Sequence, residues 1–449
     1  MTISMTARMT FGTRTLSAIL LLAFAAPVHA QDSAITHPLT LGDAARLAAR
    51  QNASAIQARY RTEQASARIT QSRSALLPSV SGYAEENGRS FNTATFGIPF
   101  PGFDPRGQVI GPVNLFDVRG KISENFLDFA ALQRVKSART TARAFGATAE
   151  NEAEISAQNA ASAYLRAQRA DAQLGARQAD SVLADSLLGI SREELRAGVG
   201  VALDVTRAQS QFASVRAQLI VARNERDRAR LDLLRALGEP LTANVTLADS
   251  LTRLEVRDTT IDEAGAIEAA MHARPDLRAA DEQIRAAQQQ VTAIKAERLP
   301  SLSAFGDYGY IGDQRYLGTY DWGIQVSIPI FDGLHREGRI EEAKAMANEI
   351  DVRRRDLRQQ VAIEVRGALL DLASARQEAD AVREALRLAQ QEVAQAQERF
   401  RAGVAGNADV ITASLALNTA RTQAVDALAS YQGAKVALAR AVGSVTTLP

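Results

Sequence analysis

Two short stretches of this chain, LRAGVGVALDV (Leu195–Val205) and FRAGVAGNADV (Phe400–Val410), share the tetrapeptide Arg-Ala-Gly-Val. The two glycines lie 205 residues apart (403 − 198), and in each stretch an Asp follows the Gly by six positions. Glycine readily adopts the left-handed backbone conformation that ends many helices, and an Asp is stabilised near the start of a helix. Both stretches therefore predict the tip of a helical hairpin, where a long helix ends at Gly198 or Gly403 and a second helix begins.

Further landmarks recur in the same order along the chain. RALG at 235–238 is matched by RAVG at 440–443, and LLPSVSGY at 76–83 is matched by RLPSLSAF at 298–305. A period of about 200 residues is that of a duplicated domain and not of a solenoid. We therefore expect a first repeat over 31–240 (strands about 78–126, helical hairpin about 130–237), a linker over 241–259, and a second repeat over 260–449 (strands about 301–330, helical hairpin about 334–442).

Proline is absent from two long spans, residues 113–239 and 330–448. Because helix interiors exclude proline, each span predicts a hairpin whose outgoing helix is roughly 100 Å long, at 1.5 Å per residue. The return helices are about half as long, so the preceding helices at 53–76 and 276–298 are expected to stack end-on above them. The second outgoing helix carries an unbroken apolar heptad seam, as in a coiled coil: Val361, Val365, Ala368, Leu372, Ala375, Ala379, Val382, Leu386, Ala389, Val393, Ala396 and Phe400. The first has no such clean register.

Residues 1–30 have the features of a secretory signal peptide. Arg8 and Arg14 precede the apolar run LSAILLLAFAA (16–26), and small residues then lead to a cleavage site before Gln31. The mature chain is therefore expected to be exported. No later segment contains 18 consecutive apolar residues, so a membrane-embedded part would have to be made of strands.

The composition argues against catalytic and metal sites. The chain has no Cys and only 4 His, and the His residues lack the spacing of metal ligands. Neither a nucleophile elbow nor a phosphate-binding loop occurs in the sequence. A net charge of +1 without basic blocks argues against a nucleic-acid partner. We therefore expect no catalytic residue, no metal site and no cofactor.

Aromatic residues gather just before the two long helical spans. Of the 23 aromatic residues, 15 lie in residues 79–129 and 301–331, where the sequence alternates in polarity. Strands with one apolar face and a girdle of aromatic residues are typical of outer-membrane barrels. The predicted membrane aromatic girdle comprises Tyr83, Phe116, Phe126, Tyr308, Tyr310, Tyr320 and Trp322. Four strands cannot close a barrel and open edges are not tolerated in lipid, so the chain is expected to assemble, and a trimer would give twelve strands.

These features together resemble the TolC-type outer membrane efflux family, over essentially the whole mature chain. The most specific marks are the two tips, Gly198-Val199-Gly200-Val201 with Asp204 and Gly403-Val404-Ala405-Gly406 with Asp409. The resemblance implies a mainly α fold with a transmembrane β portion. Each protomer would be a duplicated unit of a long coiled-coil helical hairpin plus two strands, and a homotrimer would form a 12-stranded β-barrel on an α-helical tunnel.

The same resemblance implies a function and partners. The protein would be a channel-tunnel in the outer membrane of a Gram-negative bacterium, extending into the periplasm and in contact with outer membrane lipid. It would export small molecules, metal ions or polypeptides as part of a tripartite efflux or type I secretion system. Its partners would be a periplasmic adaptor (membrane fusion protein) and, through it, an inner-membrane pump.

Roles for residues of the periplasmic gate also follow from the resemblance. Asp204 and Asp409 correspond to carboxylates that line the narrow periplasmic mouth, where three copies of each would favour cations. Each Asp could instead simply begin its helix. Phe400 stands where some members have a Tyr that latches the closed tip, and Ala405 stands where those members have an Arg, so that latch cannot form here. Phe400 is then either a gate residue or the last residue of the heptad seam.

The adaptor-contact tip is expected to comprise Arg196, Gly198, Val199, Gly200, Val201, Arg401, Gly403, Val404 and Ala405. Apolar side chains on a solvent-facing turn indicate a contact with a partner. The two arginines could bond an adaptor, or they could offset the negative end of the preceding helix.

A periplasmic coiled-coil adaptor or a structural tether is the alternative interpretation of the same helices. An adaptor would have one hairpin between the halves of a small β-domain, whereas this chain has two complete hairpins. A tether would leave the aromatic strands unexplained. The sequence does not indicate the transported substrate.

Overall fold

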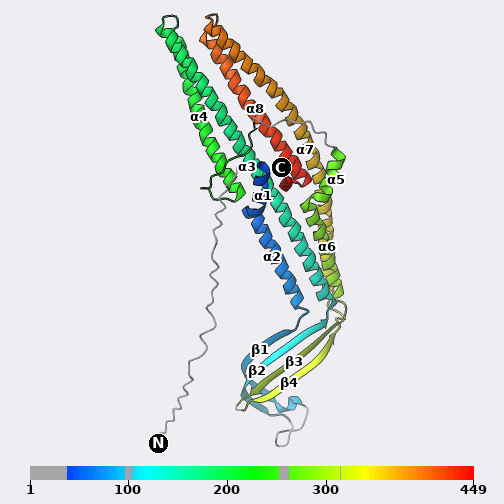
Figure 1. The fold of residues 1–449 in the computed structure, drawn as a ribbon. Helices are drawn as coiled ribbons and strands as arrows, with labels where there is room; N and C mark the ends of the chain where they lie inside the picture. The colour runs from blue at the N-terminus through cyan, green and yellow to red at the C-terminus, as the bar shows by residue number, and fades with distance from the viewer. Residues whose placement is uncertain are drawn as a thin grey trace, which may run out of the picture.

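The computed structural model describes residues 38–96, 106–251, 262–313 and 315–448, together with Gly102 and Asp104. A long bundle of helices ends at a small sheet, and the two hairpin tips lie at the opposite end of the molecule (Figure 1). The predicted signal segment 1–30 lies outside the described residues, as do residues 252–259 of the predicted linker.

Each repeat contains the same series of elements. The first has α1 (Leu41–Gln51), α2 (Ala53–Ser74), β1 (Ser79–Asn92), the 3-10 helix η1 (Thr93–Phe96), β2 (Val109–Leu127), α3 (Phe129–Arg196) and α4 (Ala202–Leu237). The second has α5 (Glu263–Ala273), α6 (Pro275–Ala296), β3 (Ser301–Gly312), β4 (Leu317–Ser327), α7 (His335–Arg401) and α8 (Asn407–Val442), followed by the 3-10 helix η3 (Val445–Thr447). The outgoing helices have 68 and 67 residues and the return helices 36 each, which confirms the duplicated unit.

The return helix of each hairpin ends against a break between two shorter helices. The C-cap of α4 is Gly238, whose φ of 81° lies in the left-handed region that glycine adopts readily. A Cβ at this position would lie 2.7 Å from the main-chain oxygen of Gln51. Gly443, with φ 83°, ends α8 in the same way against Arg274. α2 and α6 then run along the remaining halves of α3 and α7, as the sequence predicts. The sequence did not reveal the short helices α1 and α5, which precede these breaks.

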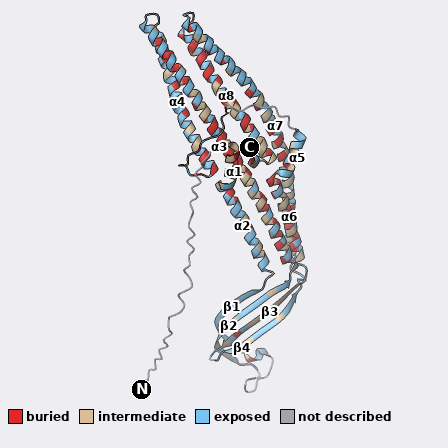
Figure 2. Ribbon diagram, viewed as in Figure 1, coloured by how far each residue is buried: buried red, intermediate tan, exposed pale blue. Residues whose placement is uncertain are grey.

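The two outgoing helices bury their side chains differently. α7 contacts α5, α6 and α8 within the chain, and none of its twelve heptad-seam residues is exposed. α3 contacts four long neighbours, α2, α4, α6 and α8. It is therefore buried on several sides, as at the adjacent Ala160, Ala161, Ala163 and Tyr164, which explains why it has no single seam (Figure 2). Among the described helices, none is both long and apolar enough to cross a membrane.

The strands form one antiparallel sheet in the order β1-β2-β3-β4, so β1 and β4 are its edges. The register places Tyr308 opposite Tyr320 and Asp307 opposite Asp321. Because successive side chains on a strand point to opposite faces, the tyrosines lie on one face and the aspartates on the other. The aspartate face also carries Arg119, which bonds Asp307 at 2.9 Å.

A polar clamp holds the middle of α3 to the segment that precedes α1. Leu39 forms a parallel bridge with Leu247, and the hydroxyl of the fully buried Tyr164 donates to the main-chain oxygen of Leu39 at 2.8 Å. The same hydroxyl lies 3.1 Å from Asp249, and Gln168 donates to the Asp249 main-chain oxygen at 3.0 Å. Burial raises the pKa of Tyr164 well above its ordinary value, so its hydroxyl stays a donor. The described part of the predicted linker is thus fixed to the bundle.

Candidate functional site

The tip of the first hairpin is a tight turn closed by main-chain hydrogen bonds. Gly198 has φ 76°, and the amides of Val199 and Gly200 both donate to the oxygen of Glu194, at 3.1 and 3.0 Å. A Cβ on Gly200 would lie 2.9 Å from the Cβ of Glu194. The turn therefore needs glycine twice, once for its conformation and once for the close approach of the chain.

The second tip repeats the turn with one change. Gly403 has φ 70°, and the amide of Val404 donates to the oxygen of Arg399 at 3.0 Å. Ala405 stands at the position of Gly200 (405 − 205), and Gly406 is the N-cap of α8. The left-handed glycines predicted at the ends of the outgoing helices are confirmed.

Apolar and basic side chains cover the outer surface of both tips. Val199 is 81% exposed and Val404 68% exposed, and Val201 is exposed beside them. Arg196 is exposed and pairs with Glu193 one turn earlier, whereas Arg401 makes no ion pair within the described residues. Each turn thus exposes apolar side chains, and the guanidinium of Arg401 beside the second turn has no ion-pair partner among the described residues.

The two tip aspartates occupy different surroundings. Asp204 lies in the first turn of α4, is partly exposed, and has Arg207 at 3.6 Å. Asp409 lies in the first turn of α8, is exposed, and has no ion pair among the described residues. Neither side chain caps its own helix. Of the two carboxylates in the described chain, Asp409 is therefore the more exposed and the one without a nearby cation.

Phe400 is buried where the second hairpin packs against the first. It packs with Leu187 of α3 and Val410 of α8 in a buried apolar cluster. This placement is the one expected of the last heptad-seam residue, and the gate assignment of Phe400 gains no support from it.

Polar contacts join the two hairpins beside this apolar cluster. Asp180 of α3 has a fully buried side chain that bonds Arg421 of α8 and also Arg177, at 3.2 Å. Nearer the tip, Asn407 is 0% exposed and donates to the hydroxyl of Ser191 at 2.9 Å and to the main-chain oxygen of Asp204 at 3.1 Å. Sequence reasoning missed Asn407, because only the fold brings residues 216 positions apart into contact (407 − 191).

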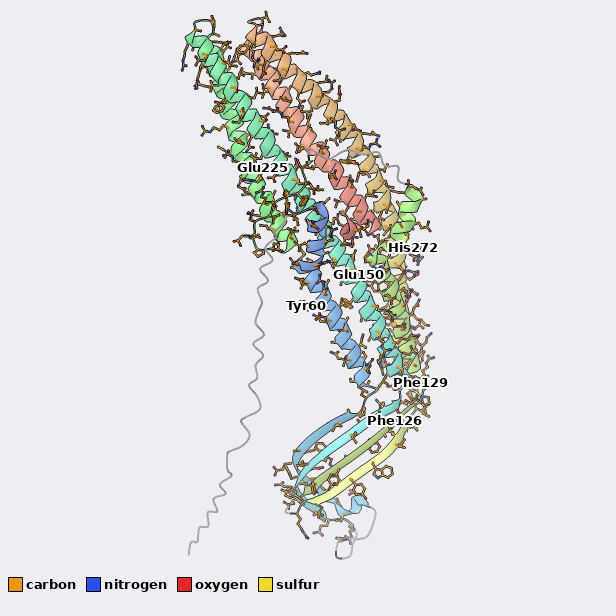
Figure 3. The ribbon with its side chains drawn as sticks, in the orientation of Figure 1. Tyr60, Phe126, Phe129, Glu150, Glu225 and His272 are labelled. Carbon is orange, nitrogen blue, oxygen red and sulfur yellow. The ribbon has the colours of Figure 1, made fainter. Side chains whose placement is uncertain are left out.

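Six of the seven predicted girdle aromatics are exposed: Phe116, Phe126, Tyr308, Tyr310, Tyr320 and Trp322. Phe126 lies where the sheet meets the helices (Figure 3). Tyr83 is the exception, since it pairs with Arg119 across the strands and has Lys121 4.8 Å from its ring centroid. Its assignment to the girdle is therefore corrected: the alternation of the strand turns Tyr83 to the charged face.

No group of His, Cys, Asp and Glu side chains in the described parts of the chain could hold a metal ion. The site is thus a pair of turns joined by polar and apolar contacts, with a charged and an aromatic sheet face at the other end of the molecule.

This architecture matches known proteins along most of its length. The model of the outer membrane efflux protein family matches residues 45–239 and 266–444, which include both hairpins and all four strands. The chain belongs to this family. Its fold is also that of the outer membrane channel CmeC of Campylobacter jejuni, at 19% identity, with a TM-score of 0.75 over 90% of this chain and 85% of that one.

Two curated relatives of the family resemble the chain over part of their length. Protein CyaE of Bordetella pertussis is 26% identical over 68% of this chain and 64% of its own length. The pyoverdine export outer membrane protein OpmQ of Pseudomonas aeruginosa is 26% identical over 58% of this chain and 55% of its own. The chain thus matches about three fifths of the length of these relatives. An outer-membrane location agrees with the family and with the names of these proteins.

Proposed function

We propose that three copies of this chain form an outer membrane channel-tunnel that exports molecules through the periplasm and the outer membrane. The observation that carries the proposal is the sheet, which has two free edges, β1 and β4, and an exposed face rich in aromatic and aliphatic side chains. Free edges leave main-chain donors and acceptors unpaired, which lipid does not tolerate. Pairing β4 of one copy with β1 of the next satisfies both edges.

The two sheet faces suit such a barrel. Trp322, Tyr320 and Ile324 would face lipid, while Arg119, Asp307 and Asp321 would line the water-filled interior. The helices would continue the wall of the barrel as a tunnel, with the hairpin tips at the periplasmic mouth. Asp204 and Asp409 would form rings of negative charge there, and Asp409 would contribute more because no cation in the described chain pairs with it.

The tips would also receive the partners. Val199, Val201 and Val404 form an apolar surface that a soluble turn does not need, which fits a periplasmic adaptor linked to an inner-membrane pump. The name of OpmQ describes export of pyoverdine, so small molecules are one reasonable cargo class beside metal ions and polypeptides. A tripartite efflux or type I secretion system accommodates all three.

The deciding experiment is the mass of the protein extracted in detergent from purified outer membranes, after expression with residues 1–30 intact. A trimer that also conducts ions in planar bilayers is the expected result. A monomer recovered from the soluble periplasm would refute the channel and favour the adaptor or tether.

A further inference from the structure

The second tip contains a buried polar side chain that its own helix does not require. Asn407 is the first residue of α8, and its side chain makes no hydrogen bond to α8 itself. The equivalent first residue of α4 is Ala202 (407 − 205), which is exposed. Starting the return helix therefore does not explain an asparagine at this position.

The bonds of Asn407 all point to the other hairpin. Its Nδ2 donates to Ser191 Oγ on α3 and to the main-chain oxygen of Asp204 on α4. The orientation of the amide is settled, because the Asp204 oxygen can only accept. Ser191 in turn donates to the main-chain oxygen of Leu187 at 3.0 Å. One side chain of the second hairpin thus holds both helices of the first.

The remaining atom of the amide indicates how much depends on these bonds. Asn407 Oδ1 is buried and has no hydrogen-bond partner. An unpaired buried carbonyl oxygen is unfavourable, and an apolar side chain of the same size would avoid it. Asn407 thus combines two hydrogen bonds between the hairpins with the cost of burying an unpaired Oδ1.

We propose that Asn407 is a positioning residue that fastens the tip of the second hairpin to the first, fixes Asp204 relative to α8, and so restricts the mouth. The restriction of the mouth rests on the proposed channel function, whereas the fastening of the two hairpins does not. Neither Phe400, which lies in an apolar cluster, nor Ala405 can make a polar contact between the hairpins with its side chain, whereas Asn407 can.

The test uses Asn407→Leu, which keeps the number and branching of the side-chain heavy atoms and removes both donors. Asn407→Asp also removes the N–H groups, and Thr412→Ala, an exposed residue of α8 that bonds only the oxygen of Ala408, is the matched control. Hydrogen exchange of the purified full-length protein would follow the amides of residues 202–208 and 407–413. Single-channel conductance in planar bilayers would report how far the mouth is restricted.

Asn407→Leu and Asn407→Asp should each raise amide exchange at both tips about tenfold and resting conductance about twofold, with Thr412→Ala like the unmodified protein. Adding Ser191→Ala to Asn407→Leu should change neither value further, because the contact is already lost. Unchanged exchange or unchanged conductance in Asn407→Leu would overturn the proposal. An unmodified protein that never conducts would refute the channel instead, and exchange would still decide whether Asn407 fastens the hairpins.

Discussion

The side-chain amide of Asn52 donates a hydrogen bond of 2.9 Å to the main-chain oxygen of Ala236, where α4 ends against the break between α1 and α2. In the second repeat Arg274 makes the equivalent bond, at 3.3 Å, to the oxygen of Ala441 (441 − 236 = 205). The two repeats thus close the same joint with a neutral donor in one case and a buried cation in the other.

The two joints should differ in their response to alanine. Asn52→Ala removes the cap of α2 and the bond to Ala236, so we expect a loss of about 1–2 kcal/mol in the free energy of unfolding. Arg274→Ala leaves Asp276 and Glu364 without their cation and should remove roughly 3–5 kcal/mol. Denaturant unfolding of the detergent-solubilised protein measures both. The exposed Arg353→Ala is the control, and an Asn52→Ala loss equal to that of Arg274→Ala would contradict the distinction.

Asp180 should give the contact between the hairpins a dependence on pH. Burial raises the pKa of this carboxyl above its ordinary value, although Arg421 and Arg177 oppose the shift. The folded chain therefore keeps a proton on Asp180 at pH values where the unfolded chain has released it. The resulting stabilisation is complete below the unfolded pKa near 4 and is lost as the pH rises through the folded pKa.

Unfolding of the unmodified protein and of Asp180→Asn, followed from about pH 4 upward, isolates that effect. The stability of the unmodified protein should fall relative to Asp180→Asn as the pH rises. The exposed Asp185→Asn on the same helix is the matched control. Parallel pH profiles for the unmodified protein and Asp180→Asn would show that Asp180 does not titrate in this way.

Trp322 offers a direct test of which sheet face contacts lipid. It is the single tryptophan of the chain and is 75% exposed, so intrinsic tryptophan fluorescence reports on this position alone. In vesicles we expect emission shifted to shorter wavelength and strong quenching by brominated phospholipids, because indole prefers the membrane interface. Tyr83→Phe, on the charged face, should leave the quenching unchanged. Efficient quenching by aqueous iodide would be inconsistent with lipid contact.

Asp409 should control block by polyvalent cations more strongly than Asp204. Removing one unpaired carboxylate per copy should weaken block roughly fivefold, equivalent to about 1 kcal/mol of attraction. Asp204→Ala should have a smaller effect, because Arg207 already lies near that carboxylate. Single-channel recordings test this with Glu225→Ala, an exposed carboxylate of α4 away from the tip, as control (Figure 3). Unaltered block in Asp409→Ala would reduce Asp409 to a residue that begins α8.

The apolar tip patch should govern binding of the adaptor. Val199→Ser with Val404→Ser should weaken adaptor binding roughly tenfold, since exposed valines contribute only when a partner covers them. The trimer mass should not change, and Leu241→Ser, an exposed apolar residue outside the tips, should bind normally. Surface-immobilised trimer and purified adaptor suffice for the measurement. Equal affinities would place the docking surface away from the turns.

Much of the architecture could be predicted from local pattern alone. The heptad from Val361 to Phe400 and the left-handed turns at Gly198 and Gly403 depend on residues close in sequence, and each appears in the structure as expected. Strand membership followed equally from alternating polarity. The sheet face on which Tyr83 lies could not be predicted in this way, because whether Tyr83 shares a face with Trp322 depends on how β1 and β4 pair through β2 and β3.

The missed features share one physical origin, which is contact between distant segments. The clamp of Tyr164 to Leu39 and Asp249, and the bond from Asn407 to Ser191, join residues that no local pattern connects. The start of α2 at residue 53 was predicted, but the helix α1 before Asn52 was not, because only the end of α4 packed against this position makes a break between two helices necessary.

The clamp at Tyr164 leaves the rest of α3 as a stiff arm. From Tyr164 to Arg196 there are 32 residues (196 − 164), roughly 48 Å of helix at 1.5 Å per residue. A rotation of about 5° at the clamp would therefore move Ser191, 27 residues along the helix (191 − 164), by roughly 3.5 Å, which is enough to break its 2.9 Å bond with Asn407. So small an angle breaks that bond while every helix keeps its own hydrogen bonds. Parting the two tips would then separate side-chain contacts, such as Asn407 with Ser191 and Phe400 with Leu187, without melting any helix.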